Sequence, residues 1–222
     1  MKNWKYQVVV KGNVVAISTT KAEADAEAKR VKGFVLMHNP LLLKPGAEGW
    51  DRYGALVADA YTKAPDYDAA ALPAWEALER WIPKMFKRIQ GVVDVEFVDD
   101  DPYRDDAHLR DEVARTGVLK VWTGGTAHPV WSHENNLKFR AIHDWMAHIQ
   151  PKGKPDFGMK GEIAGYNAHL HTVPPLARRA LFTEVVGQAA VALYTGEFPE
   201  QKIAFLEGFD PYRIGNVTGW KI

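Results

Sequence analysis

The chain contains no cysteine, and neither sign of charge is in excess. Without cysteine it has no disulfide, thiolate zinc site, iron–sulfur cluster or cysteine nucleophile. Its 28 Lys and Arg residues balance its 28 Asp and Glu residues, which does not support a nucleic-acid partner or a polybasic membrane anchor. No stretch approaches the roughly 18 apolar residues of a membrane span, and the first residues lack the apolar run of a secretory signal. The sequence therefore predicts a soluble globular protein without a membrane partner.

Periodicity and turn signals predict two parts. Residues 1–38 contain two short alternating runs, an Ala-rich helix and a third apolar run, which is typical of a small ββαβ unit. Thr20 lies three residues before Glu23, the spacing of a capping box at the start of that helix. Residues 39–222 open with a loop rich in Pro and Gly and continue mainly as helices, with short strands at residues 92–98 and 118–122. We therefore expect an α+β fold that is mostly helical, with a small N-terminal unit and one or two further short strands.

Histidine is unevenly placed along the chain. Six of the eight histidines lie between residues 128 and 171. Imidazole is the commonest metal ligand in proteins and a frequent acid–base group. This segment is therefore where the sequence predicts a site.

The helix predicted at residues 134–149 carries His143, Asp144 and His148. In a regular α-helix, His143 and His148 point about 140° apart. They can bind one metal only if the helix is distorted or ends near His148, and Pro151 favours such an end. The alternative is that His143 is a hydrogen-bonded core residue while Asp144 and His148 face solvent.

The helix predicted at residues 160–172 places Glu162, Tyr166 and His169 on one stripe. A carboxylate and an imidazole on the same face suit a divalent metal. The alternative is that Glu162 only complements the helix dipole from the first turn.

The helix predicted at residues 175–195 is apolar on nearly all sides but contains Glu184. A buried carboxylate is costly unless it is paired, protonated or bound to a metal. Glu184 is therefore expected either to form an ion pair with Arg140, Arg178 or Arg179, or to serve at a metal or catalytic site.

These three helices together predict a centre for one or two divalent metal ions. The predicted metal ligands are His143, His148, Glu162 and His169. The predicted catalytic residues are Asp144, Glu184 and Arg140. Asp144 or Glu184 would act as the base or orient a ligand, and Arg140 would contact an anionic substrate such as a phosphate. Ligation without thiolates suits Zn, Mn, Fe or Mg.

Two resemblances use the same residues. The segment FRAIHDWMAH at residues 139–148, followed by FG at 157–158, GE at 161–162, TE at 183–184 and GQ at 187–188, resembles a family of uncharacterised phage-encoded proteins. This resemblance covers roughly residues 90–195. It implies a viral origin, with the protein in the cytoplasm of the infected host cell or in the virion.

A looser similarity is to the HD-domain metal phosphohydrolases, on His143-Asp144, His148, Phe157-Gly158 and Gly161-Glu162. It implies a nucleotide or another phosphorylated small molecule as substrate. Those enzymes take a further His from an earlier helix and an Asp from a later one. Here the later helical acid is Glu184, and this departure weakens the similarity.

The leading prediction from the sequence is a metal-dependent hydrolase, in its narrower form a phosphohydrolase. The first alternative is a non-haem iron enzyme that activates oxygen, since imidazoles and carboxylates on neighbouring helices also describe such centres. The second alternative is a non-enzymatic phage structural or interaction protein, self-associating or part of a virion, whose His/Glu cluster is a buried polar network.

Overall fold

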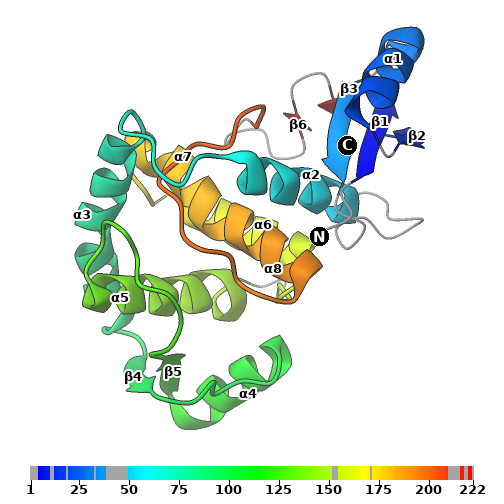
Figure 1. The fold of residues 1–222 in the computed structure, drawn as a ribbon. Helices are drawn as coiled ribbons and strands as arrows, with labels where there is room; N and C mark the ends of the chain where they lie inside the picture. The colour runs from blue at the N-terminus through cyan, green and yellow to red at the C-terminus, as the bar shows by residue number, and fades with distance from the viewer. Residues whose placement is uncertain are drawn as a thin grey trace. The chain divides into compact units, whose positions relative to one another are not determined.

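The structure is a computed structural model that describes residues 5–10, 13–18, 20–32, 34–38, 50–151, 155–170, 172–209, 216–217 and 220–221. The fold is α+β and mostly helical, which confirms the predicted fold class. The chain divides into two compact units (Figure 1). One comprises residues 1–64, 187–199 and 206–222, and the other comprises residues 65–186 and 200–205.

The first unit contains the predicted ββαβ arrangement. Its sheet has the antiparallel order β2-β1-β3, formed by β1 (Lys5–Val10), β2 (Asn13–Ser18) and β3 (Phe34–His38). Helix α1 (Lys21–Val31) begins at the predicted cap, where the Thr20 side chain accepts a hydrogen bond from the Glu23 N–H at 3.3 Å. Its buried alanines pack on Val8 of the sheet.

The first unit is larger than the predicted residues 1–38, because α2 (Trp50–Lys63) and α8 (Gln188–Thr195) belong to it. These two helices pack against each other. Gly187 lies at their contact, where an added Cβ would stand 2.7 Å from the Tyr61 ring. The short β6 (Asn216–Val217) and β7 (Trp220–Lys221) form an antiparallel pair in the same unit.

The second unit is built around α3 (Leu72–Ile89), which buries Trp75, Leu78 and Ile82. Helix α3 packs against α5 (His133–His143) and against the segment formed by η2 (Pro175–Ala177) and α7 (Arg178–Leu181). Helix α6 (Met159–Leu170) packs against η1 (Asp144–Ile149). A parallel pair of strands, β4 (Asp94–Val98) and β5 (Val118–Trp122), is connected through α4 (Asp106–Thr116).

Two helices that the sequence predicted as continuous are interrupted. The helix predicted at residues 134–149 is α-helical only as far as His143 and continues as the π-helical η1. The helix predicted at residues 175–195 passes from η2, a 3₁₀ turn, through α7 and the π-helical η3 (Phe182–Gly187) into α8. Hydrophobic periodicity could not reveal these changes, because π-helical segments are short and carry no periodic signal of their own.

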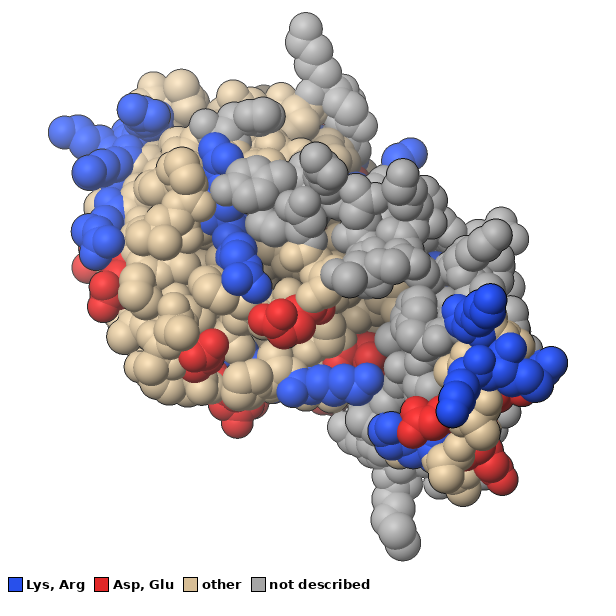
Figure 2. Space-filling model, turned by 90° about the horizontal axis from the view of Figure 1, so that it is seen from above, with Lys and Arg blue, Asp and Glu red and all other residues tan. Residues whose placement is uncertain are grey.

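No described helix is long and apolar enough to cross a membrane. On the face shown in Figure 2, Lys and Arg side chains lie among Asp and Glu side chains, and neither sign covers that face. This agrees with the balanced composition of the chain.

Candidate metal centre

A π-helical segment brings His143 and His148 together. Ser132 caps the start of helix α5, where its hydroxyl accepts a hydrogen bond from the Asn135 N–H at 3.1 Å. After His143 the backbone widens, and the Gln150 N–H donates to the Trp145 carbonyl, five residues earlier, at 2.8 Å. In this bonding pattern residues five apart lie above one another, so the 140° separation expected for a regular α-helix does not arise.

Helix α6 supplies the carboxylate that faces these two imidazoles. Glu162 Oε2 lies 3.2 Å from His143 Nε2, and Glu162 Oε1 lies 3.5 Å from His148 Nε2. The two Nε2 atoms are themselves 3.2 Å apart. The helix can approach this closely because Gly165 faces η1, where an added Cβ would stand 2.5 Å from the Ala147 Cβ.

The three ligand atoms fit a divalent cation. They lie within 4.8 Å of one another, and His143, His148 and Glu162 form the group that could hold a metal ion in the described part of the chain. Bonds of about 2.1 Å at tetrahedral angles place ligand atoms roughly 3.4 Å apart. The two Nε2 atoms are 3.2 Å apart, and each lies 3.2 or 3.5 Å from a Glu162 oxygen, Oε2 for His143 and Oε1 for His148, which is close to that spacing.

The environment of His148 prepares its Nε2 atom to bind a metal. His148 Nδ1 lies 3.2 Å from the Pro155 carbonyl oxygen, which can only accept a hydrogen bond, so the proton belongs on Nδ1 and Nε2 keeps its lone pair. Arg110 donates to the same carbonyl at 3.3 Å, which helps to fix it. Phe157 covers the His148 ring edge-on, with ring centroids 4.7 Å apart. His148 itself is only 1% exposed.

Burial and neighbouring charges shift the pKa values of these groups in different directions. Burial, reinforced by the charge of His143, lowers the pKa of His148 to about 4. Burial also opposes a charge on His143, but the Glu162 carboxylate and Asp144 outweigh it and raise the pKa of His143 above its usual value. Burial raises the pKa of Asp144 to about 6, against the opposite effect of His143.

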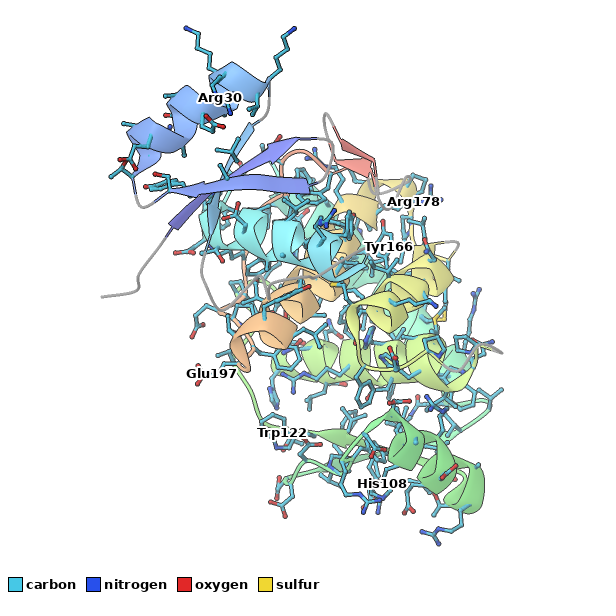
Figure 3. All side chains as sticks on the ribbon, turned by 90° about the vertical axis from the view of Figure 1, so that its right-hand side faces the viewer. Arg30, His108, Trp122, Tyr166, Arg178 and Glu197 are labelled. Atoms are coloured by element: carbon cyan, nitrogen blue, oxygen red, sulfur yellow. The ribbon has the colours of Figure 1, made fainter. Side chains whose placement is uncertain are left out.

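His169, the fourth predicted ligand, is not one of the three residues whose ligand atoms converge. Its ring stacks on the ring of His143. The two rings are nearly parallel, at 9°, with centroids 5.6 Å apart. His169 is fully buried, and neither ring nitrogen has a hydrogen-bond partner among the described residues. Burial, with the charges of His143 and His148, lowers the pKa of His169 well below its usual value. Tyr166, which Figure 3 labels, lies with Glu162 and His169 on the single stripe of α6 that the sequence predicted, and all three are buried.

The predicted catalytic residues Asp144 and Arg140 have different surroundings. Asp144 is half-buried and makes no hydrogen bond with a described residue, but it lies close enough to His143 and Glu162 for their charges to shift its pKa. Arg140 donates from Nη1 to the carbonyls of Trp122, at 3.1 Å, and Gly124. Its guanidinium therefore holds the loop that follows β5.

Glu184, the third predicted catalytic residue, has a separate set of partners. Its Oε1 accepts a hydrogen bond from Trp75 Nε1 at 2.6 Å and lies 3.3 Å from His128 Nε2. His128 Nδ1 accepts from the N–H groups of Val130 and Trp131 at 3.1 and 2.9 Å, so Nε2 carries the proton and donates to Glu184. The His128 ring also stacks on Trp131 at 3.9 Å.

The sequence reasoning missed His128 and Trp75 as partners of Glu184. They lie 56 and 109 residues from it along the chain. His128 belongs to the histidine-rich segment, which was the one available signal, whereas nothing in the pattern around Trp75 indicated its role.

Comparison of the chain with protein-family models, with curated proteins and with solved structures finds no match. The resemblances to a phage-encoded family and to HD-domain phosphohydrolases therefore stay predictions.

Proposed function

We propose that this chain is a metal-dependent hydrolase that holds one divalent cation through His143, His148 and Glu162. The observation that carries the proposal is the convergence of two imidazole nitrogens and one carboxylate, separated by 3.2 to 3.5 Å, in a largely buried position. Two His and one Glu are the ligand set of a class of zinc hydrolases, in which water or substrate takes the remaining position. A bound cation would supply a Lewis acid and acidify a water molecule.

The residues around the three ligands are suited to proton transfer. Asp144 has a pKa of about 6 and no hydrogen bond to a described residue, so its carboxylate can take up or release a proton near neutral pH. We propose it as the general base. Pro155 would keep the His148 Nε2 lone pair available through the hydrogen bond to Nδ1.

A phosphorylated small molecule is the substrate class that we propose. The support for it is the resemblance of His143-Asp144 and His148 to the HD segment of metal phosphohydrolases. Arg140 already donates to two backbone carbonyls, so we leave it out of substrate binding and assign it to the loop after β5.

A second candidate function has a specific observation in its favour. Two histidines and one carboxylate on one side of a metal also form the facial triad of non-haem iron enzymes that activate oxygen. The identity of the bound metal separates the two candidates, because iron is needed for oxygen activation and zinc, manganese or magnesium serves hydrolysis.

The first test is the metal content of protein purified without chelator or affinity tag, measured by elemental mass spectrometry with the melting temperature before and after EDTA. We expect nearly one metal per chain and a lower melting temperature after chelation, because a ligand at 100 times its Kd stabilises the folded state by about 2.7 kcal/mol. His143→Ala should abolish metal binding. His133→Ala is the matched control, since His133 is exposed at the start of the same helix.

Hydrolysis is then tested with the metal found, on a panel of nucleoside mono- and triphosphates and p-nitrophenyl phosphate. Asp144→Asn should retain the metal and lose most of the activity. Full metal content in His143→Ala would contradict the ligand assignment. Protein that takes up no Zn, Mn, Fe or Mg and melts unchanged in EDTA would instead favour a buried polar network in a non-enzymatic protein.

A further inference from the structure

The pair formed by β4 and β5 has two edges that differ in their hydrogen bonding. The register aligns Asp94 with Val118 and Val98 with Trp122 in a parallel ladder. The Asp94 N–H donates to the Gly117 carbonyl at 3.1 Å, and the Val98 carbonyl accepts from the Thr123 N–H at 2.8 Å. Since bonding alternates along a strand, β4 bonds to β5 through residues 94, 96 and 98, and Val95 and Phe97 direct their N–H and C=O groups outward.

The outer edge of β5 is closed by side chains. Each of its three outward residues bonds to a side chain from elsewhere in the unit. The bonds are Val118 N–H to Thr116 Oγ1 at 3.1 Å, Lys120 N–H to Tyr103 Oη at 2.8 Å, and Arg140 Nη1 to the Trp122 carbonyl at 3.1 Å. Strand β5 also packs against α4 and α5. Figure 3 labels Trp122 at the end of this strand and His108 on α4.

The outer edge of β4 is open. Among the residues that the structure describes, the backbone groups of Val95 and Phe97 have no hydrogen-bond partner. Phe97 is 40% exposed although its ring stacks on Phe86, and Figure 1 shows β4 on the side of β5 away from α4. An edge of unpaired N–H and C=O groups is a template for a further strand, which proteins commonly use to bind extended peptides.

We infer that the β4 edge binds an extended segment of a partner protein that carries Lys or Arg at every second position. Strand addition would pair Val95 and Phe97 with the backbone of that segment. Asp94 and Glu96 are exposed on one face of β4, while Val95 and Phe97 lie on the other. A bound segment would complement β4 if its basic residues lie on the same face as Asp94 and Glu96 and its apolar residues lie on the same face as Val95 and Phe97.

Charge also decides against a second copy of this chain as the occupant. When two β4 edges pair antiparallel so that Val95 bonds to Phe97 of the second copy, Glu96 lies directly opposite Glu96 of that copy. Like charges in directly opposed positions destabilise a strand pair. A basic segment removes this repulsion.

The test uses the full chain and a fluorescently labelled acetyl-Lys-Val-Lys-Val-Lys-Val-Lys amide, with binding followed by fluorescence anisotropy. Val95→Pro removes an outward N–H that the β4–β5 ladder does not use, and its ring obstructs an incoming strand. We expect the variant to bind the peptide about tenfold more weakly or worse, because hydrogen bonds and close approach are lost together. Val95→Ala retains the N–H and is the matched control.

Two further measurements identify the kind of binding. Binding should weaken with added salt. A peptide N-methylated at every residue should not bind, because neither edge of its backbone can donate a hydrogen bond. Unchanged circular dichroism and metal content in Val95→Pro would show that the variant is folded. Equal binding by wild type and Val95→Pro, or no binding by wild type, would overturn the inference. A concentration-dependent dimer that Val95→Pro abolishes would overturn it in favour of a second copy.

Discussion

Among single side chains, Glu162 faces two imidazole nitrogens, whereas Glu184 accepts hydrogen bonds from Trp75 and His128. In the first group the Pro155 carbonyl holds the His148 proton on Nδ1, so Nε2 keeps its lone pair, whereas the proton that Glu162 favours on His143 would be released when a metal binds. In the second group Trp75 Nε1 is always a donor. His128 Nε2 is also a donor, because His128 Nδ1 accepts two backbone hydrogen bonds and the proton therefore lies on Nε2. The two buried carboxylates therefore differ in chemistry, with metal ligation fitting Glu162 and a closed polar network fitting Glu184.

This difference predicts separate effects for two substitutions. Glu184→Gln removes the negative charge to which Trp75 Nε1 and His128 Nε2 donate, so these two buried hydrogen bonds become weaker. We expect the free energy of unfolding to fall by about 1–3 kcal/mol, with metal content unchanged. Urea unfolding and elemental analysis measure the two quantities. Glu197→Gln, at the exposed position labelled in Figure 3, is the control and should change neither.

Glu162→Gln should instead lose the metal, and with it the stability that the bound metal supplies. Loss of the metal from Glu184→Gln with unaltered stability would show that Glu184 belongs to the metal centre.

At the level of elements, the metal centre depends on the contact between η1 and α6. The π-helical turns place His143 and His148 on one side of their helix, and Gly165 lets Glu162 come within reach of both. π-Helical segments are rare, and they occur often at functional sites. Metal binding is therefore expected to be sensitive to substitutions at the contact between these two elements.

Gly165→Ala tests that sensitivity. The new methyl group would stand 2.5 Å from the Ala147 Cβ, so α6 must move away from η1. Overpacking of this kind costs about 1–3 kcal/mol, and the ligand separations would widen with it. We expect weaker metal binding by isothermal titration as well as lower stability. Asn167→Ala, on the exposed face of the same helix, should change stability by no more than about 0.5 kcal/mol. Wild-type affinity in Gly165→Ala would mean that the close contact is not needed.

At the level of the whole molecule, the buried histidines link folding to pH. His148 has a pKa of about 4 in the folded protein and an ordinary value of 6.5, so between these values the unfolded chain binds a proton that the folded protein does not. Its contribution to stability is therefore present above pH 6.5 and is lost as the pH falls to about 4. His143 and Asp144 have raised pKa values and act in the opposite direction.

His148→Gln isolates the contribution of this one group. In EDTA, we expect the variant to lose less stability than wild type between pH 6.5 and pH 4, by up to roughly 3 kcal/mol. Urea unfolding at a series of pH values measures the difference, with His133→Gln as the exposed control. Parallel stability curves for wild type and His148→Gln would contradict the lowered pKa.

Much of the fold was predictable because its determinants are local. The cap at Thr20, the alternating strands and the apolar stripes each depend on residues a few positions apart, and the observed elements follow them closely. The prediction that Glu162 and His169 share one face of a helix also held, because helical periodicity alone places them there, and the structure buries that face. Periodicity could not show that residues 144–149 are π-helical, since that depends on the elements packed around them.

The amino-acid sequence was enough to identify the residues that could ligate a metal, to place them on helices and to exclude thiolate ligands. Which of these residues meet depends on the tertiary structure. It brings His143, His148 and Glu162 together, stacks the His169 ring on the His143 ring, and pairs Glu184 with Trp75 and His128. The reason is physical: side-chain type and local period are properties of neighbouring residues, whereas a shared ligand position depends on how closely two helices can pack, here through one glycine and one π-helical segment.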